Sequence, residues 1–152
     1  MQKATDLVIN ITFLVFLVIM IYLNYANLLE SKLDYGISIL AIVISIILLL
    51  FKNISILDIA HFLYCGLYLF SVAFLSKNQY LLALNVVMLI VIIFTRYYFD
   101  GCLLNKKQKN SGFFVDLNVI VKKYLFFWNW DYLFPLLLVV SLGRLIKEKE
   151  YL

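Results

Sequence analysis

The stretch LVINITFLVFLVIMIYLNYANLL, residues 7–29, decides the fold class of this chain because it contains no charged residue. A helix that spans a bilayer needs about 20 mostly apolar residues, since the hydrocarbon layer is about 30 Å thick and each helical residue rises about 1.5 Å. Asp6 precedes the stretch, and Glu30, Ser31 and Lys32 follow it. The stretch therefore predicts a transmembrane helix over residues 7–29.

The composition of the whole chain agrees with a membrane environment. Of the 152 residues, 65% are hydrophobic and 14% are charged, and the mean hydropathy is +0.99. Soluble domains average roughly 45–50% apolar and about 25% charged residues. A domain of this length has a limited interior, so the excess apolar surface must face lipid or membrane partners. We predict an all-α, polytopic integral membrane protein.

Four further segments approach the length of a membrane span, and they cover residues 36–51, 57–76, 80–98 and 132–146. Only the turn Lys77-Asn78-Gln79 separates the third span from the fourth. A connection this short predicts a tight antiparallel hairpin of helices. The chain is thus predicted to be a single transmembrane domain with five spans.

The region between the fourth and fifth spans is the most polar part of the chain. GCLLNKKQKNSG, residues 101–112, has the composition of an exposed loop. Residues 113–128 are again apolar, but charged and amide side chains interrupt them, which favours a helix lying at the membrane interface. In the alternative, one kinked helix runs from residue 124 to residue 142.

Several residues near the fifth span indicate where that helix meets the membrane surface. Trp128 and Trp130 are predicted interfacial anchors, since an indole keeps its ring in the apolar zone and its N–H in water. Asp131 is predicted to cap the helix. Pro135 falls near its start, where a missing N–H costs little.

The distribution of lysine and arginine predicts the orientation. With five alternating spans, the side of the N-terminus carries eight of these residues and the other side carries five. The eight are Lys3, Lys52, Arg96, Lys106, Lys107, Lys109, Lys122 and Lys123, and the five are Lys32, Lys77, Arg144, Lys147 and Lys149. Untranslocated loops carry the excess of Lys and Arg, so the N-terminus is predicted on the synthesis side.

The third span holds the best candidate for a polar site. Asp58, His61 and Cys65 stand at i, i+3 and i+7, with Tyr64 and Tyr68 on adjoining positions. Ionisable groups are costly inside a membrane, and this set suggests a proton relay formed by Asp58, His61, Cys65 and Tyr68, or one contribution to a metal site. Alternatively, Asp58 and His61 reach water or cap the backbone near the helix start.

Other polar residues suggest structural roles first. Arg96 and Asp100, at i and i+4, predict an interfacial ion pair that closes the fourth span, with binding of a lipid headgroup as the alternative. Asn10, Asn24 and Asn85 lie within spans and predict hydrogen bonds between helices.

We expect no cofactor and no metal in this chain. One histidine with the distant Cys65 and Cys102 cannot readily supply a closed N/S site, and two histidine ligands for a haem are lacking. The cations show no basic stripe interleaved with aromatics, so no nucleic-acid partner is expected. Nucleophile elbows, phosphate-binding glycine loops and HExxH are also absent from the sequence.

From His61 to about Leu142, the order of elements is a histidine-led helix, a tight turn, a helix ending in Gly101-Cys102-Leu103-Leu104, and a terminal span. This order resembles a small family of bacterial membrane proteins with a Cys-Pro-Leu-Thr motif. Leu103 and Asn105 stand where that motif has proline and threonine. The resemblance implies no activity.

The leading functional hypothesis is a structural or accessory subunit of a larger membrane complex, without catalytic activity of its own. The 13 Phe and 11 Tyr predict bulky surfaces for lipids and other membrane subunits. The Ile, Asn, Lys, Phe and Tyr bias suits AT-rich genes, as in organelles, which suggests a respiratory-type complex of the mitochondrial inner membrane. The alternatives are a small transporter or proton-conducting protein using Asp58, His61 and Arg96, and a virion membrane protein of a large DNA virus.

Overall fold

The computed structural model describes residues 2–107 and 129–150, and between them only residues 112, 113, 116, 120, 123 and 124. The predicted interfacial helix over 113–128, including Trp128, thus lies largely outside the described residues. The long helices are α1 (Gln2–Tyr25), α2 (Lys32–Leu50), α5 (Gln79–Tyr98) and α8 (Trp130–Glu150). The helical segments α3 (Ile54–Phe62), η1 (Leu63–Tyr68) and α4 (Leu69–Phe74) follow one another directly, and α6 (Leu103–Lys107) is short.

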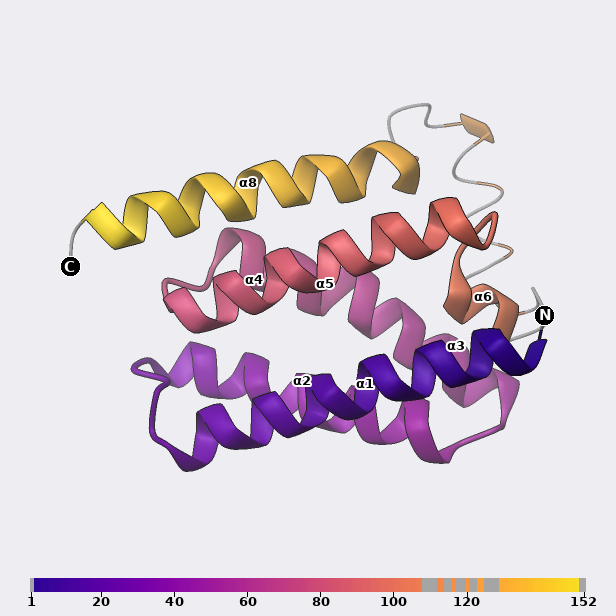
Figure 1. Cartoon of the computed structure of the whole chain (residues 1–152), viewed down its shortest axis with the longest axis horizontal. Helices are drawn as coiled ribbons and strands as arrows, with labels where there is room; N and C mark the ends of the chain where they lie inside the picture. The colour runs from indigo at the N-terminus through magenta and orange to yellow at the C-terminus, as the bar shows by residue number, and fades with distance from the viewer. Residues whose placement is uncertain are drawn as a thin grey trace.

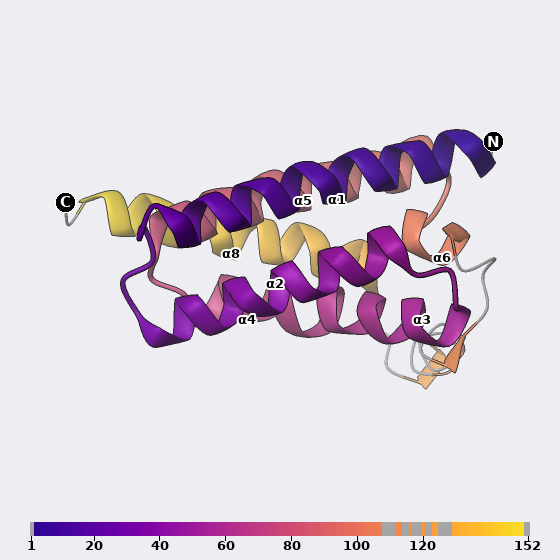
Figure 2. The same cartoon turned by 90° about the horizontal axis from the view of Figure 1, so that it is seen from below.

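The helices form an up-and-down bundle (Figure 1). α3, η1 and α4 together make one continuous rod that lies alongside α2 (Figure 2). The N-terminus, residues 51–53, α6 and the start of α8 lie at one end, which we call the N-terminal end of the bundle. The α1–α2 loop, the α4–α5 turn and the end of α8 lie at the opposite end.

Within the described ranges, four helical rods are long and apolar enough to cross a membrane: Ala4–Tyr25, Lys32–Leu50, Ile54–Phe74 and Gln79–Tyr98. No strand occurs among the described residues. The predicted class, an all-α multi-pass membrane protein, is confirmed.

The predicted fifth span corresponds to α8, which is not among these four rods. α8 has 21 residues, but it has Asp131 in its first turn and carries Arg144, Lys147 and Glu148 toward its end. It nevertheless runs beside α5 from one end of the bundle to the other (Figure 1). The crossing of the membrane by α8 therefore stays a prediction.

Two predicted helix boundaries, both at the α1–α2 loop, were wrong by four residues each. α1 ends at Tyr25 rather than Leu29, because Asn27 adopts a left-handed conformation with φ 52° that a helix cannot continue. α2 begins at Lys32 rather than Gly36, because the Ser31 hydroxyl accepts a hydrogen bond from the Asp34 N–H at 3.0 Å and caps the helix.

The prediction that Asp131 caps the last helix was also wrong. The side-chain carbonyl of Asn129 accepts a hydrogen bond from the Asp131 N–H at 3.1 Å, and the Asn129 backbone carbonyl accepts from Tyr132 and Leu133. Asn129 is thus the cap, and α8 begins at Trp130 instead of residue 132. The Asp131 carboxylate instead points toward α5, where it pairs with Arg96.

Aromatic side chains fill the centre of the bundle where α1 packs on η1. Tyr64 and Tyr68 are stacked, with ring centroids 5.6 Å apart. Phe13 meets Tyr64 edge-on at 5.1 Å, and Phe16 meets Tyr68 in the same way at 5.4 Å. All four rings are buried, so they fix α1 against the segment that carries the predicted polar site.

Candidate functional site

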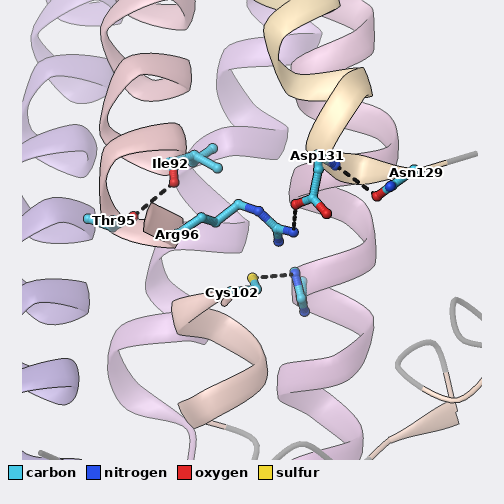
Figure 3. Close-up of polar contacts among 7 residues, drawn as sticks. Ile92, Thr95, Arg96, Cys102, Asn129 and Asp131 are labelled. Atoms are coloured by element: carbon cyan, nitrogen blue, oxygen red, sulfur yellow. Dashed lines mark hydrogen bonds and ion pairs between the residues drawn. The ribbon is translucent and has the colours of Figure 1, made fainter. Parts of the chain in front are cut away.

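The thiol of Cys102 and the imidazole of His61 meet at the N-terminal end of the bundle, where Cys102 Sγ lies 3.5 Å from His61 Nε2 (Figure 3). His61 comes from α3, whereas Cys102 follows α5. Asp100 and Gly101 both have positive φ, 52° and 124°, and turn the chain back toward the bundle. Glycine tolerates such a conformation. The turn therefore places a half-buried thiol against a histidine 41 residues earlier in the chain.

The short helix α6 holds Cys102 in this position. The Cys102 carbonyl accepts the first hydrogen bond of α6 from the Lys106 N–H at 3.1 Å. The ammonium group of Lys106 donates to the Phe99 carbonyl at the end of α5. The ammonium group of Lys107 donates to the Leu48 carbonyl at the end of α2. α6 is thus tied to two long helices, and Leu104 anchors it in the core.

A second thiol reaches the same imidazole. Cys65 stands one turn after His61, is 6% exposed and interacts with the His61 ring. It belongs to η1, where the backbone takes π-helical hydrogen bonds and the Leu69 N–H donates to the Tyr64 carbonyl five residues earlier. Single π-helical turns inside α-helices are frequent at functional sites.

A charged pair borders the thiol–imidazole contact. The Arg96 guanidinium forms an ion pair with the Asp131 carboxylate, which joins α5 to α8 (Figure 3). The guanidinium also lies 5.5 Å from the centroid of the Phe134 ring. The predicted partner, Asp100, was wrong: its left-handed backbone lies beyond the end of α5, so the i, i+4 geometry of a helix is lost.

A cavity of about 50 Å³ opens beside these groups, between α1, η1, α5 and α8. Its wall includes both cysteines, Arg96 and Thr95, while most of its remaining lining is apolar, including Phe13, Met88 and Ile92. On this measure, which counts the positions open to the centre of a water-sized sphere, a single water needs roughly 10–15 Å³. The cavity therefore admits a small reactant next to the thiols.

The surroundings favour the ionised thiol of Cys102. Burial alone raises its pKa, but the charge and hydrogen bond of His61, the backbone N–H of Asn105 and the charge of Arg96 outweigh burial and lower the pKa to about 7. The thiolate is the nucleophilic form of cysteine, and cationic neighbours stabilise it. A substantial fraction of Cys102 is thus ionised at neutral pH.

The structure separates the four residues of the predicted relay into three places along the third rod. His61 and Cys65 join the site with Cys102. Tyr68 lies deeper, stacked on Tyr64, and neither phenol oxygen has a hydrogen-bond partner among the described residues. Asp58 is buried against Gly112: a Cβ at residue 112 would lie 2.5 Å from its carboxylate.

Of the predicted interfacial anchors, only Trp130 is described. Its ring lies 5.2 Å from Phe134 and 6.5 Å from Phe70, between α8 and α4. It stands in the first turn of α8, at the same end of the bundle as Arg96 and Asp131.

Sequence reasoning overlooked Cys102 and Asp131 as site residues. The Cys102–His61 contact joins residues 41 positions apart, and the Arg96–Asp131 ion pair joins residues 35 positions apart. No local spacing in the sequence therefore reveals them. The available signal was the position of Cys102, directly after Gly101 where a span ends, in a chain with one histidine.

No protein-family model, curated protein or solved structure matches this chain. In the described part of the chain, no group of three or more His, Cys, Asp or Glu side chains is arranged to hold a metal ion. Function is therefore inferred from the thiol–imidazole geometry.

Proposed function

We propose that this multi-pass membrane protein performs a thiol-dependent reaction at the N-terminal end of its bundle, with Cys102 as the nucleophile. The observation that carries the proposal is the 3.5 Å contact between Cys102 Sγ and His61 Nε2 at the edge of a cavity. Nucleophile and base within hydrogen-bond reach, with further groups orienting them, are the signature of an activated nucleophile.

Each residue of the site has a role in this proposal. His61 accepts the Cys102 proton, and the resulting imidazolium stabilises the thiolate. Arg96 adds positive charge, and Asp131 holds the guanidinium in place through the ion pair. The apolar cavity wall excludes water and favours an uncharged reactant. The attacked atom would occupy the cavity beside Cys102 Sγ.

The rate of Cys102 alkylation by iodoacetamide, measured from about pH 5 to about pH 9 in a Cys65→Ala background, tests the proposal. The rate should rise with pH through a midpoint near 7, the lowered pKa of this thiol. His61→Gln removes the imidazole and should move the midpoint upward by at least one pH unit, toward about 8.5, the ordinary value for cysteine.

Lys52→Gln is the matched control. Lys52 is exposed in the α2–α3 connection at the same end of the bundle, so its loss removes a positive charge without touching the thiol. The alkylation midpoint of this variant should equal that of the parent. An unchanged midpoint in His61→Gln would refute the role of His61.

A second candidate function is the accessory subunit of a larger membrane complex, including a respiratory-type complex of the mitochondrial inner membrane. The outward face of α5 supports it, because aromatic side chains gather there: Phe94 is 65% exposed, Tyr97 90% and Tyr98 71%. Large exposed aromatic patches suit helix–helix contacts between subunits. Purification in mild detergent tests this function: a subunit co-migrates with a much larger complex, whereas a lone monomer contradicts it.

A further inference from the structure

The two cysteines of the site come from different parts of the chain yet share one imidazole and one cavity. Cys65 stands a helical turn after His61, while Cys102 reaches the ring from beyond α5. Both thiols line the same cavity, and both are free. No other cysteine exists in the sequence.

We infer that Cys65 is the resolving thiol for Cys102, and that the site carries out thiol–disulfide exchange with small, uncharged disulfides. This inference rests on the proposed function and names its reaction and substrate class. It is carried by the contact of Cys102 with His61, by the position of Cys65 one helical turn after His61, and by the apolar cavity that both thiols line.

The exchange balances with the two thiols and one disulfide reactant. The Cys102 thiolate attacks one sulfur of the disulfide, so a mixed disulfide forms and the first thiolate leaves. His61, which received the Cys102 proton, returns a proton to that leaving group. Cys65 then gives up its proton to His61 and attacks Cys102 Sγ. The internal disulfide forms, the second thiolate leaves and takes that proton, and the reactant is reduced by two electrons.

The difference in burial explains why Cys102 reacts first and Cys65 acts as the resolving thiol. Cys102 is half-buried at the end of the bundle, so a reactant can reach it first. Cys65 is only 6% exposed and lies within the third rod, so it would attack the mixed disulfide from the interior of the bundle. The π-helical backbone of η1 carries Cys65 at the cavity wall.

One equivalent of 4,4′-dithiodipyridine, an uncharged aromatic disulfide, tests the inference on the purified full chain. Each thiolate that leaves gives one thiopyridone, which is counted by absorbance. The wild type should release two thiopyridones per reagent and contain a Cys65–Cys102 cross-linked peptide by mass spectrometry. Cys65→Ala should release one and retain the mixed disulfide on Cys102. One thiopyridone from the wild type would overturn the inference.

The outcomes separate this inference from the proposed function. If the wild type releases one thiopyridone but Cys102 still reacts fast in a His61-dependent manner, Cys102 is the nucleophile and Cys65 is not its partner. If Cys102 reacts no faster in the wild type than in His61→Gln, both proposals fail.

Oxidised glutathione, which is charged, tests the substrate class. The rate of each disulfide with the protein is divided by its rate with a free cysteine peptide, and this ratio should be lower for oxidised glutathione than for dithiodipyridine. An equal ratio would contradict the uncharged substrate class.

Discussion

Individual charged side chains around Cys102 set the pKa of its thiol. His61 contacts the thiol from α3 and Arg96 acts on it from α5, while Asp131 on α8 compensates part of the Arg96 charge. Cys65 of η1 lines the same cavity. A thiolate is stabilised by the guanidinium and destabilised by the carboxylate. The two members of the ion pair should therefore shift the pKa of Cys102 in opposite directions.

Arg96→Gln should raise the pKa of Cys102, and Asp131→Asn should lower it, because each removes a charge of opposite sign. At a pH near 7, alkylation of Cys102 should thus slow in the first variant and quicken in the second. The pH midpoint of alkylation in the Cys65→Ala background measures both shifts. Equal shifts of the same sign would show that the variants act through the fold and not through charge.

Gly112 should be required for stability. Its φ of 135° is a conformation that residues with a Cβ rarely adopt, and a Cβ would lie 2.5 Å from the Asp58 carboxylate. Gly112→Ala should lower the free energy of unfolding by about 1–3 kcal/mol. Gly143→Ala, where a Cβ meets nothing within 4 Å, should leave it equal or raise it by about 0.5–1 kcal/mol. Thermal unfolding in detergent compares the two, and equal effects would contradict this account.

At the scale of elements, polar contacts between helices position the rods that carry the site. The Asn85 amide of α5 donates to the Ser141 hydroxyl of α8 at 3.0 Å and to the Leu69 carbonyl of α4 at 3.3 Å. Arg144 of α8 donates to the Ala73 carbonyl at 2.8 Å. The predicted role of Asn85 in bonding between helices is confirmed, and α8 is held against two rods at once.

Asn85→Ala should loosen α8 from the bundle, because hydrogen bonds between membrane helices contribute about 0.6 kcal/mol each on average. We expect a loss of about 1–2 kcal/mol in the free energy of unfolding, including the buried Ser141 hydroxyl left without its donor. Val87→Ala is the control, since Val87 is 53% exposed on the outward face of α5. Unfolding monitored by tryptophan fluorescence, with Trp130 in α8, should show no stability difference for Val87→Ala. A loss in Val87→Ala as large as in Asn85→Ala would contradict this role of the amide.

Helix positions could be predicted from apolar runs, but helix ends could not. The second span was predicted to begin at residue 36, after Asp34, because a charged side chain interrupts the apolar run there. In the structure, Ser76 and Ser31 each donate to this buried carboxylate at 2.6 Å, so the helix includes it. Ser76 comes from the α4–α5 turn, 42 residues later, and a single-sequence pattern does not reveal such a partner.

At the scale of the whole molecule, the two ends of the chain lie at opposite ends of the bundle (Figure 1). If α8 crosses the membrane as the predicted fifth span, the two ends of the chain lie on opposite sides of it. The excess of Lys and Arg on the N-terminal side favours retention of the N-terminus on the synthesis side. The site would then face the side from which the chain is inserted.

Fusions to alkaline phosphatase and green fluorescent protein, which are active on opposite sides of a bacterial inner membrane, test the topology. A fusion after residue 152 should be active with the phosphatase and dark with the fluorescent protein, whereas a fusion after Lys52 should behave in the opposite way. The reverse result for both fusions would invert the orientation. The same result at both positions would show that the number of crossings between them is even.

Parts of the site could be predicted from sequence, because ionisable residues in an apolar span are costly to bury. His61 and Cys65 were found in this way, and Arg96 was found as a charged residue at a helix end. Cys102 and Asp131 were missed because the packing of α5, α6 and α8 brings them to the site. The chemistry at Cys102 emerges only from the assembled bundle.

Direct titration of Cys102 by thiolate absorbance near 240 nm tests the central claim. The spectrum of Cys65→Ala is recorded against that of the variant lacking both cysteines, which removes the tyrosine and tryptophan background. We predict a single absorbance step with a midpoint near pH 7, lost from this range in Cys65→Ala/His61→Gln. A thiol that stays protonated until about pH 8.5 or above, as an ordinary cysteine does, would contradict the claim.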